Sequence, residues 1–468
     1  MSFVLTIKLK TEIFQEHKIN KSFNVAVRIY NSLLSYELKK FNSLKNNHNY
    51  ITITSKHKKN KEDYSILKSL YKQYGFTSFD FNKDIKGIRN HYKNNISSQV
   101  GQKLAKRMWA SFDKYLNSNG KDIHYKKYNT INSLEGASNT NGIVFKDNSL
   151  YYLDMIIPVI IPNNDYVKEA LNNKVCYCRI LRKISKKGYN YYVQLTLEGV
   201  SPKKKRYKTD GRVGIDIGTS TIAICSDYNV SIGELSKEIK DNGDKIKHIN
   251  RKIERSKRIL NPDNYNDDKT IKEGKHKWII SKHCKKLYHL RSYLYQKVNN
   301  QRKYLYEVLS NDILRQGNVI IVEQMDFKGL QKRKKETEIN DKGRYKCKKR
   351  FGKSIAKHAP SMLINIIERK APLYGANVIK VDKFKYRASQ YNHIKDEYIK
   401  HKLNDRKFII GDYECQRDMY SAYLLKCYKD KETIDRELCI KEFNRFKELH
   451  DIEIERLKKQ VNIKCIGY

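Results

Sequence analysis

The stretch Arg212-Val-Gly-Ile-Asp-Ile-Gly218 is an apolar run interrupted by one carboxylate, that of Asp216. Its hydrophobic residues predict a β-strand, and Thr221-Ile-Ala-Ile-Cys-Ser-Asp227 predicts a second strand after a turn at Gly218. An aspartate inside such a strand costs free energy unless its side chain binds a cation or joins a hydrogen-bond network. The stretch therefore predicts part of an α/β fold and a candidate site within it.

Two further acids stand in similar positions. Asn318-Val-Ile-Ile-Val-Glu323 is a continuous apolar run, typical of a strand buried on both faces, and its glutamate emerges where open α/β folds place their sites. Asp418 opens a predicted helix near Arg417. Converging carboxylates are what two magnesium ions require to cut a phosphodiester, and an RNase H-like sheet brings these three positions together. On composition alone, three neighbours compete with Asp418: Asp405, Asp412 and Glu414.

The charge of the chain indicates a polyanionic partner. Its 468 residues contain 96 Lys and Arg against 51 Asp and Glu, a formal net charge of +45, which favours nucleic acid over a membrane surface. No apolar run reaches the length of a membrane-spanning helix, and Met1-Ser-Phe-Val-Leu-Thr-Ile-Lys8 lacks the layout of a signal peptide. We expect a cytoplasmic protein of a prokaryote, associated with the nucleoid and not with a membrane.

The nine cysteines are odd in number and contain no C-x-x-C pair, so we expect free thiols in a reducing cytoplasm.

The periodicity of the chain predicts several domains. Segments 1–20 and 120–205 are rich in short β runs and predict a small β domain, interrupted by a helical insertion at 21–119. Segment 206–430 predicts an α/β domain with a charged helical insertion at about 236–316, broken near Asn261-Pro262. A helical tail is expected at 431–468. The lysine cluster at the junction of these two domains, Lys203-Lys-Lys-Arg206, is either a solvated linker or a phosphate contact.

Three segments resemble a known family. Gly214-Ile-Asp-Ile-Gly218, Val322-Glu-Gln-Met-Asp-Phe-Lys-Gly-Leu330 and Gly411-Asp-Tyr-Glu-Cys-Gln-Arg-Asp-Met-Tyr-Ser-Ala422 are similar to the motifs of the RuvC-type nuclease in TnpB proteins. These are transposon-encoded, RNA-guided nucleases related to compact type V CRISPR effectors. The third motif, normally C-G-x4-R-D-x-N-A, selects Asp418 over its acidic neighbours.

The resemblance implies a multidomain α/β fold: an RNase H-like RuvC domain preceded by a β-barrel wedge domain with a helical recognition insertion. It implies an RNA-guided DNA endonuclease in which Asp216, Glu323 and Asp418 hold two Mg²⁺ ions, with guide RNA and double-stranded target DNA as partners. The alternatives are a nuclease-inactive RNA-guided repressor, a compact type V effector, and a DNA-joining transposase. The basic residues assigned to nucleic-acid binding are Lys203, Lys204, Lys205, Arg206, Arg251, Arg255, Arg291, Lys332, Arg333 and Arg417.

One departure from the family lies in segment 389–415, where the family has a zinc ribbon with four cysteines. The corresponding positions are Asn392, Lys395, Phe408 and Gly411, none of which replaces a thiolate. His393 and Cys415 are nearby, but two ligands do not make a structural zinc site, so we expect no zinc. We expect an apolar mini-core in its place, made of Tyr391, Ile394, Phe408 and Ile410. Tyr420 stands where the third motif has asparagine.

Overall fold

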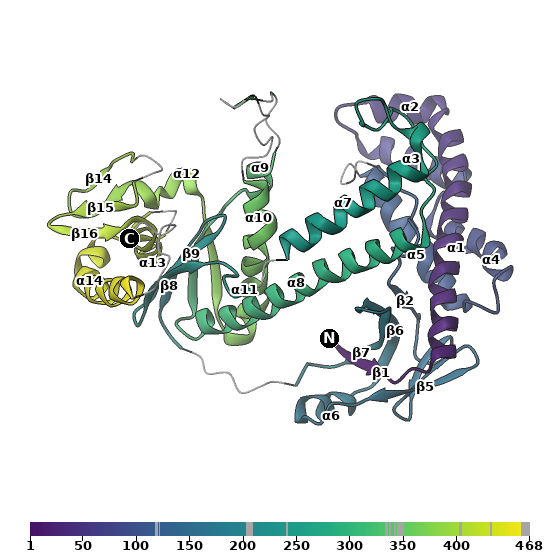
Figure 1. Cartoon of the computed structure of the whole chain (residues 1–468), viewed down its shortest axis with the longest axis horizontal. Helices are drawn as coiled ribbons and strands as arrows, with labels where there is room; N and C mark the ends of the chain where they lie inside the picture. Colours follow the sequence, from purple (N-terminus) through teal and green to yellow (C-terminus); the bar gives the residue numbers. More distant parts are fainter. Residues whose placement is uncertain are drawn as a thin grey trace. The chain divides into compact units, whose positions relative to one another are not determined.

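The computed structural model describes residues 1–117, 120, 122–202, 209–239, 242–332, 336, 338–340, 343, 351–401, 405–430 and 433–459. The chain divides into two compact units, Met1–Lys204 and Lys205–Tyr468 (Figure 1). Five of the basic residues assigned to nucleic acid lie outside the described residues: Lys203, Lys204, Lys205, Arg206 and Arg333.

The first unit contains an antiparallel seven-stranded sheet of order β2-β6-β7-β1-β5-β4-β3. The sheet curls into a half-barrel, and Asn139 links two strands far apart in this order: its Oδ1 accepts hydrogen bonds from Phe145 N (2.7 Å) on β3 and Cys178 Sγ (3.2 Å) on β6. The predicted β domain thus forms a curled sheet. Its strands are β1 (Ser2–Leu9), β2 (Ser133–Glu135), β3 (Ile143–Lys146), β4 (Ser149–Tyr152), β5 (Met155–Ile160), β6 (Val175–Ile184) and β7 (Tyr189–Glu198).

Helices fill the sequence between β1 and β2, as the periodicity predicts. The first of them begins at Ile13, before the expected position, because Glu12 and Gln15 form a capping box there. Phe41 stacks on Phe76 at 5.3 Å between ring centroids, and Phe76 meets Phe112 edge-on at 5.0 Å, so aromatic packing fixes these helices. The helices of this unit are α1 (Ile13–Lys45), α2 (His48–Ser55), α3 (Lys61–Gln73), α4 (Ser78–Asn90), α5 (Ser98–Leu116) and α6 (Asp165–Leu171).

The second unit is built on a mixed five-stranded sheet of order β10-β9-β8-β11-β12. Strands β8, β9 and β10 are antiparallel, whereas β8, β11 and β12 are parallel. This confirms the strands that the apolar runs predict, and the mixed α/β class with them. The strands are β8 (Arg212–Ile217), β9 (Thr221–Cys225), β10 (Val230–Glu234), β11 (Val319–Glu323) and β12 (Asn377–Val381).

Each face of this sheet is covered by helices. Alternate residues of β8, such as Val213 and Ile215, pack in one core with α8 (Lys282–Leu314) and α11 (Pro360–Tyr374). The opposite face packs in a second core with α13 (Arg417–Lys426) and α14 (Arg436–Lys458). The segment predicted as a helical tail therefore supplies α14, which packs into the unit's own core.

The charged helical insertion forms a hairpin of α7 (Gly243–Leu260) and α8, which Figure 1 shows extending from the sheet. A 3-10 turn at Pro262–Asn264 follows α7, at the break that the sequence predicts. Shorter elements complete the unit: α9 (Phe327–Leu330), α10 (Gly352–His358), α12 (Lys383–Tyr386), a 3-10 turn (Ala388–Gln390) and the hairpins β13 (Tyr391–Asn392) with β14 (Glu397–Tyr398) and β15 (Lys407–Ile410) with β16 (Tyr413–Gln416).

Among the described residues, no helix combines the length and the apolar character needed to cross a membrane. The described cysteines are all free thiols, as expected.

Candidate active site

The three acids singled out in the sequence line one open cleft of about 690 Å³. Asp216 lies on β8, Glu323 ends β11, and Asp418 lies in the first turn of α13. In the parallel pairing of β8 with β11, Val322 lies opposite Ile215. The next residue of each strand, Glu323 and Asp216, therefore emerges at the same edge of the sheet.

A glycine on β8 places α13, and with it Asp418, over the sheet. Because side chains alternate along a strand, Gly214 and Asp216 share the face that α13 covers. A Cβ atom at Gly214 would lie 1.9 Å from the carbonyl oxygen of Ala422 and 2.4 Å from the backbone nitrogen of Lys426. Only glycine lets the helix backbone lie directly on the strand.

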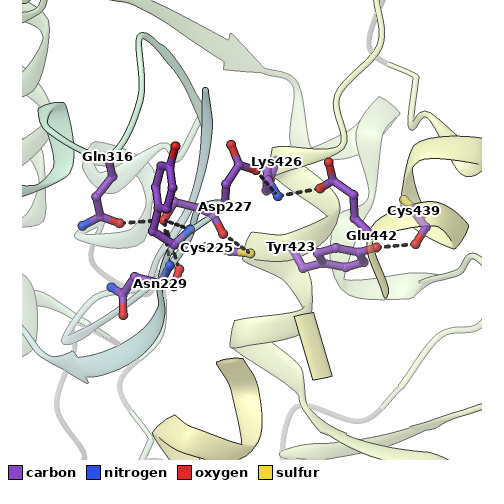
Figure 2. Close-up of polar contacts among 10 residues, drawn as sticks. Cys225, Asp227, Asn229, Gln316, Tyr423, Lys426, Cys439 and Glu442 are labelled. Carbon is purple, nitrogen blue, oxygen red and sulfur yellow. Dashed lines mark hydrogen bonds and ion pairs between the residues drawn. The ribbon is translucent and has the colours of Figure 1, made fainter. Parts of the chain in front are cut away.

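A buried lysine holds the other end of α13 (Figure 2). Lys426 Nζ lies 2.5 Å from Asp227 Oδ1, just after β9, and 2.5 Å from Glu442 Oε2 on α14. The lysine side chain is only 6% exposed. Burial alone lowers the pKa of Lys426, but its hydrogen bonds to Asp227 and Glu442 outweigh this effect and raise it, so the ammonium stays charged.

Burial and the carboxylates of Asp418 and Glu323 raise the pKa of Asp216. The pKa of Asp216 is raised well above its usual value, first by burial and then by the negative charges of Asp418 and Glu323; Arg417 opposes the shift. Burial also raises the pKa of Glu323, with Lys383 opposing and Asp382 reinforcing it. Asp216 keeps some exposure to the cleft. This concentration of negative charge favours a bound cation.

Asp418 is turned toward two arginines. Arg417 Nε lies 2.9 Å from Asp418 Oδ1, and Arg406 Nη1 lies 3.4 Å from Oδ2. Over the part of the chain that the structure describes, no three Asp, Glu, His or Cys side chains converge closely enough to bind one metal ion. The three carboxylates have the hard oxygen chemistry that Mg²⁺ prefers, so the donor set fits this ion once Asp418 changes partner.

The structure separates the described basic residues that the sequence assigns to nucleic acid. Arg417 lines the acidic cleft. Arg251 and Arg255 are exposed on α7, and Lys332 is exposed after α9. Arg291 on α8 donates to Asn250 Oδ1 on α7 (2.9 Å), so it ties the two helices of the hairpin together.

Three basic residues of the cleft were not singled out in the sequence. Lys400, His401 and Arg406 line the cleft together with the three acids. They lie in the segment compared with the zinc ribbon, where no spacing or periodicity distinguishes them from the many other basic residues of the chain. Only their position in the fold reveals them.

The ribbon segment folds through hairpins and apolar packing. Asn392 Oδ1 accepts hydrogen bonds from the backbone nitrogens of Ile394 and Lys395, and Gly411 has a φ of +64° in the turn between β15 and β16. Of the expected mini-core, Tyr391, Phe408 and Ile410 are buried with α13 and α14. The prediction is wrong for Ile394, which is 40% exposed because the turn directs it outward.

His393 and Cys415 are both buried, but each is used within the core. His393 Nδ1 lies 2.8 Å from the hydroxyl of Tyr420, the residue that replaces the family's asparagine. Burial lowers the pKa of His393 to about 4, with Arg436 adding to the effect, so its ring is neutral. Burial raises the pKa of the Cys415 thiol, which makes it a poor ligand.

Comparison with known proteins gives structural matches alone. No family model and no curated protein sequence matches the chain. The chain is similar to a Cas12f1–sgRNA–target DNA complex (TM-score 0.42, 13% identity, 91% of this chain and 98% of that chain). It is also similar to a CRISPR-Cas12f ternary complex, with a TM-score of 0.27, 14% identity and coverage of 89% of this chain and 82% of that chain. A third match is the mini-RNA-guided endonuclease CRISPR-Cas_phi3, with a TM-score of 0.37, 11% identity and coverage of 91% of this chain and 92% of that chain.

Proposed function

We propose that this protein is an RNA-guided DNA endonuclease that cuts DNA in a RuvC-type site, as TnpB proteins do. The observation that carries the proposal is the meeting of Asp216, Glu323 and Asp418, from three distant segments, in one cleft. The sheet supports it, because three antiparallel strands followed by two parallel ones in the order 3-2-1-4-5 are the arrangement of an RNase H-like domain.

The three acids would hold two Mg²⁺ ions, which supply an activated water and stabilise the leaving 3′ oxygen of the phosphodiester. The charges of both other acids act on Asp216, so all three carboxylates would contribute to holding the cations. Lys400, Arg406 and Arg417, which line the same cleft, would orient the phosphate by charge-assisted hydrogen bonds.

Guide RNA and double-stranded target DNA are the proposed partners. The net charge of +45 suits a protein that binds nucleic acid through its phosphates, and the curled sheet and helices of the first unit would serve as wedge and recognition domains. A compact type V CRISPR effector would use the same reaction with a guide from another source. A nuclease-inactive repressor is disfavoured, because all three acids stand in the cleft.

The test begins with RNA that co-purifies with the protein when it is expressed with its flanking DNA. Sequencing this RNA identifies the guide and distinguishes a transposon end from a CRISPR repeat. The complex is then incubated with Mg²⁺ and a plasmid library that carries the guide-matched target beside randomised sequence. We expect double-strand cuts that Asp216→Ala abolishes while RNA binding persists. Cutting by Asp216→Ala at the wild-type rate would overturn the assignment.

A further inference from the structure

The carboxylate of Asp418 is occupied on both oxygens by guanidinium groups. Arg417 holds Oδ1 at 2.9 Å and Arg406 holds Oδ2 at 3.4 Å, while the Asp418 side chain is 15% exposed. A divalent cation shared with Asp216 and Glu323 needs at least one of these oxygens. Asp418 therefore cannot serve as a metal ligand and keep both arginines in their present positions.

The hairpin of β15 and β16 brings the two arginines together. Arg406 directly precedes β15 and Arg417 directly follows β16, next to the paired residues Lys407 and Gln416. The backbone nitrogen of Arg417 donates to the carbonyl oxygen of Arg406 at 2.9 Å. Since α13 starts at Arg417, the hairpin places both guanidinium groups beside the first turn of the helix, where Asp418 lies.

The two arginines are held unequally. Arg417 is 16% exposed and also donates from Nη1 to the carbonyl oxygen of Asp405 at 3.2 Å, so it has a second anchor. Arg406 is 40% exposed, and its contact with Asp418 is the longer one. An ion pair with one partly exposed and distant member is weak, so Arg406 is the partner that Asp418 exchanges more readily.

We infer that Arg406 holds Asp418 in the metal-free cleft, and that Asp418 exchanges this guanidinium for a divalent cation while Arg406 turns to a phosphate of the nucleic acid. The inference rests on the proposed function, because it concerns the same cleft. Arg406 lines this cleft with Lys400 and His401, so a released guanidinium stays where a phosphate bound near the acids would lie. Metal binding and phosphate binding are thereby coupled.

The test compares Arg406→Met with Arg406→Lys and with a matched control, Lys407→Met. Lys407 directly follows Arg406 as the first residue of β15, is 39% exposed and pairs with Glu414 at 2.9 Å, so its loss removes the same charge from the same hairpin and leaves both ion pairs of Asp418 in place. Mn²⁺ binding to the full chain, freed of nucleic acid, is measured by electron paramagnetic resonance, with Asp216→Asn identifying the binding at the acids. Cleavage kinetics are then measured with the guide complex.

We expect Arg406→Met to bind Mn²⁺ about threefold more tightly, the size appropriate to a half-exposed ion pair, and to show a higher KM for DNA. Arg406→Lys should restore both values toward wild type, and Lys407→Met should change neither. A purely structural role would weaken both metal and DNA binding. Unchanged or weaker Mn²⁺ binding by Arg406→Met, or an equal gain in Lys407→Met, would overturn the inference.

The outcomes for the two proposals are distinct. If the wild-type complex cuts DNA but Arg406→Met binds Mn²⁺ like the wild type, the exchange fails and the proposed function stands. If no variant cuts any DNA but Arg406→Met alone binds Mn²⁺ more tightly, the proposed function fails and the exchange stands.

Discussion

Replacing Lys426 by methionine should loosen the helix that carries Asp418. The change keeps the length of the side chain but removes its ammonium, which leaves the carboxylates of Asp227 and Glu442 facing each other without a cation. Removing one partner of a fully buried ion pair costs about 3–5 kcal/mol of unfolding free energy. Here Asp227 is 39% and Glu442 29% exposed, so water solvates them in part and we expect about 2–3 kcal/mol.

Differential scanning fluorimetry measures the loss. For a unit of this size, each kcal/mol lowers the Tm by roughly 2–4 °C, so we expect a decrease of about 4–12 °C. The matched control is Lys429→Met, three residues further on at an exposed position, which should leave the Tm unchanged. Neutralising the whole triad by adding Asp227→Asn and Glu442→Gln to Lys426→Met should recover most of the loss, because no carboxylate is then left unpaired.

The same variant should cut DNA more slowly at 25 °C, where it remains folded. Lys426 and Asp418 lie at opposite ends of α13, so a shift of the helix moves Asp418 relative to Asp216, and displacements of this kind reduce rates by about tenfold or more. RNA binding should be unaffected. A Lys426→Met protein that melts with the Lys429→Met control, or a triple variant no more stable than the single one, would refute the reasoning.

Four further outcomes are expected. Gly214→Ala should lower the free energy of unfolding by about 3 kcal/mol or more and abolish cleavage, because the added Cβ meets backbone atoms of α13. Gly233→Ala is the control, since a Cβ there meets open space, and it should have the Tm of the wild type. Equal Tm values for the two variants would contradict this prediction. In EDTA, the raised pKa of Asp216 makes the folded protein bind a proton more tightly than the unfolded chain, so stability falls as pH rises from the ordinary toward the raised pKa. Asp216→Asn should lack this loss of stability at high pH, and urea titrations at pH 8 should show it to be about 1 kcal/mol more stable than the wild type. A less stable variant would contradict the repulsion between Asp216 and the other two acids. His393, with its pKa lowered to about 4, makes the protein lose stability as pH falls from about 6.5 to about 4, and His393→Gln should flatten this slope between urea titrations at pH 7 and pH 5. Inductively coupled plasma mass spectrometry of protein purified without chelator should find no stoichiometric zinc, and one zinc per chain would disprove the expectation.

The sequence predicts the elements whose patterns are local. The strand around Asp216 is an apolar run interrupted by that acid, the strand before Glu323 is a continuous apolar run, and the ends of both strands in the structure match the runs closely. The acids stand out because a carboxylate inside or directly after such a run costs free energy unless it binds a cation or joins a hydrogen-bond network. The sequence does not predict strand β6 individually, because its basic residues interrupt the alternation of apolar and polar side chains. Arg182 is nevertheless buried, because Asn132 Oδ1 and the Ile131 carbonyl oxygen accept its hydrogen bonds.

The contacts that position the acids leave no local pattern. Lys426 meets Asp227 across some two hundred residues of sequence, and nothing in either neighbourhood distinguishes this lysine from the many exposed ones. Arg406 approaches Asp418 only because a hairpin folds back between them. Partners of this kind depend on the tertiary fold, so composition and periodicity cannot reveal them.

The two positions at which the chain differs from the TnpB motifs, the missing cysteines and Tyr420, lie in one packed region. A zinc ribbon would hold the segment before α13 through four thiolates, and here none of those thiolates is present. Tyr420, which replaces the motif's asparagine, is buried and places its hydroxyl 2.8 Å from His393 Nδ1 in that segment, while Phe408 packs into the same core. Because Tyr420 lies two residues after Asp418 on α13, this contact joins segment 389–415 directly to the helix that carries the acid. An asparagine at position 420, with its shorter side chain, would leave His393 without that partner, so the tyrosine and the cysteine-free segment before α13 depend on each other through packing.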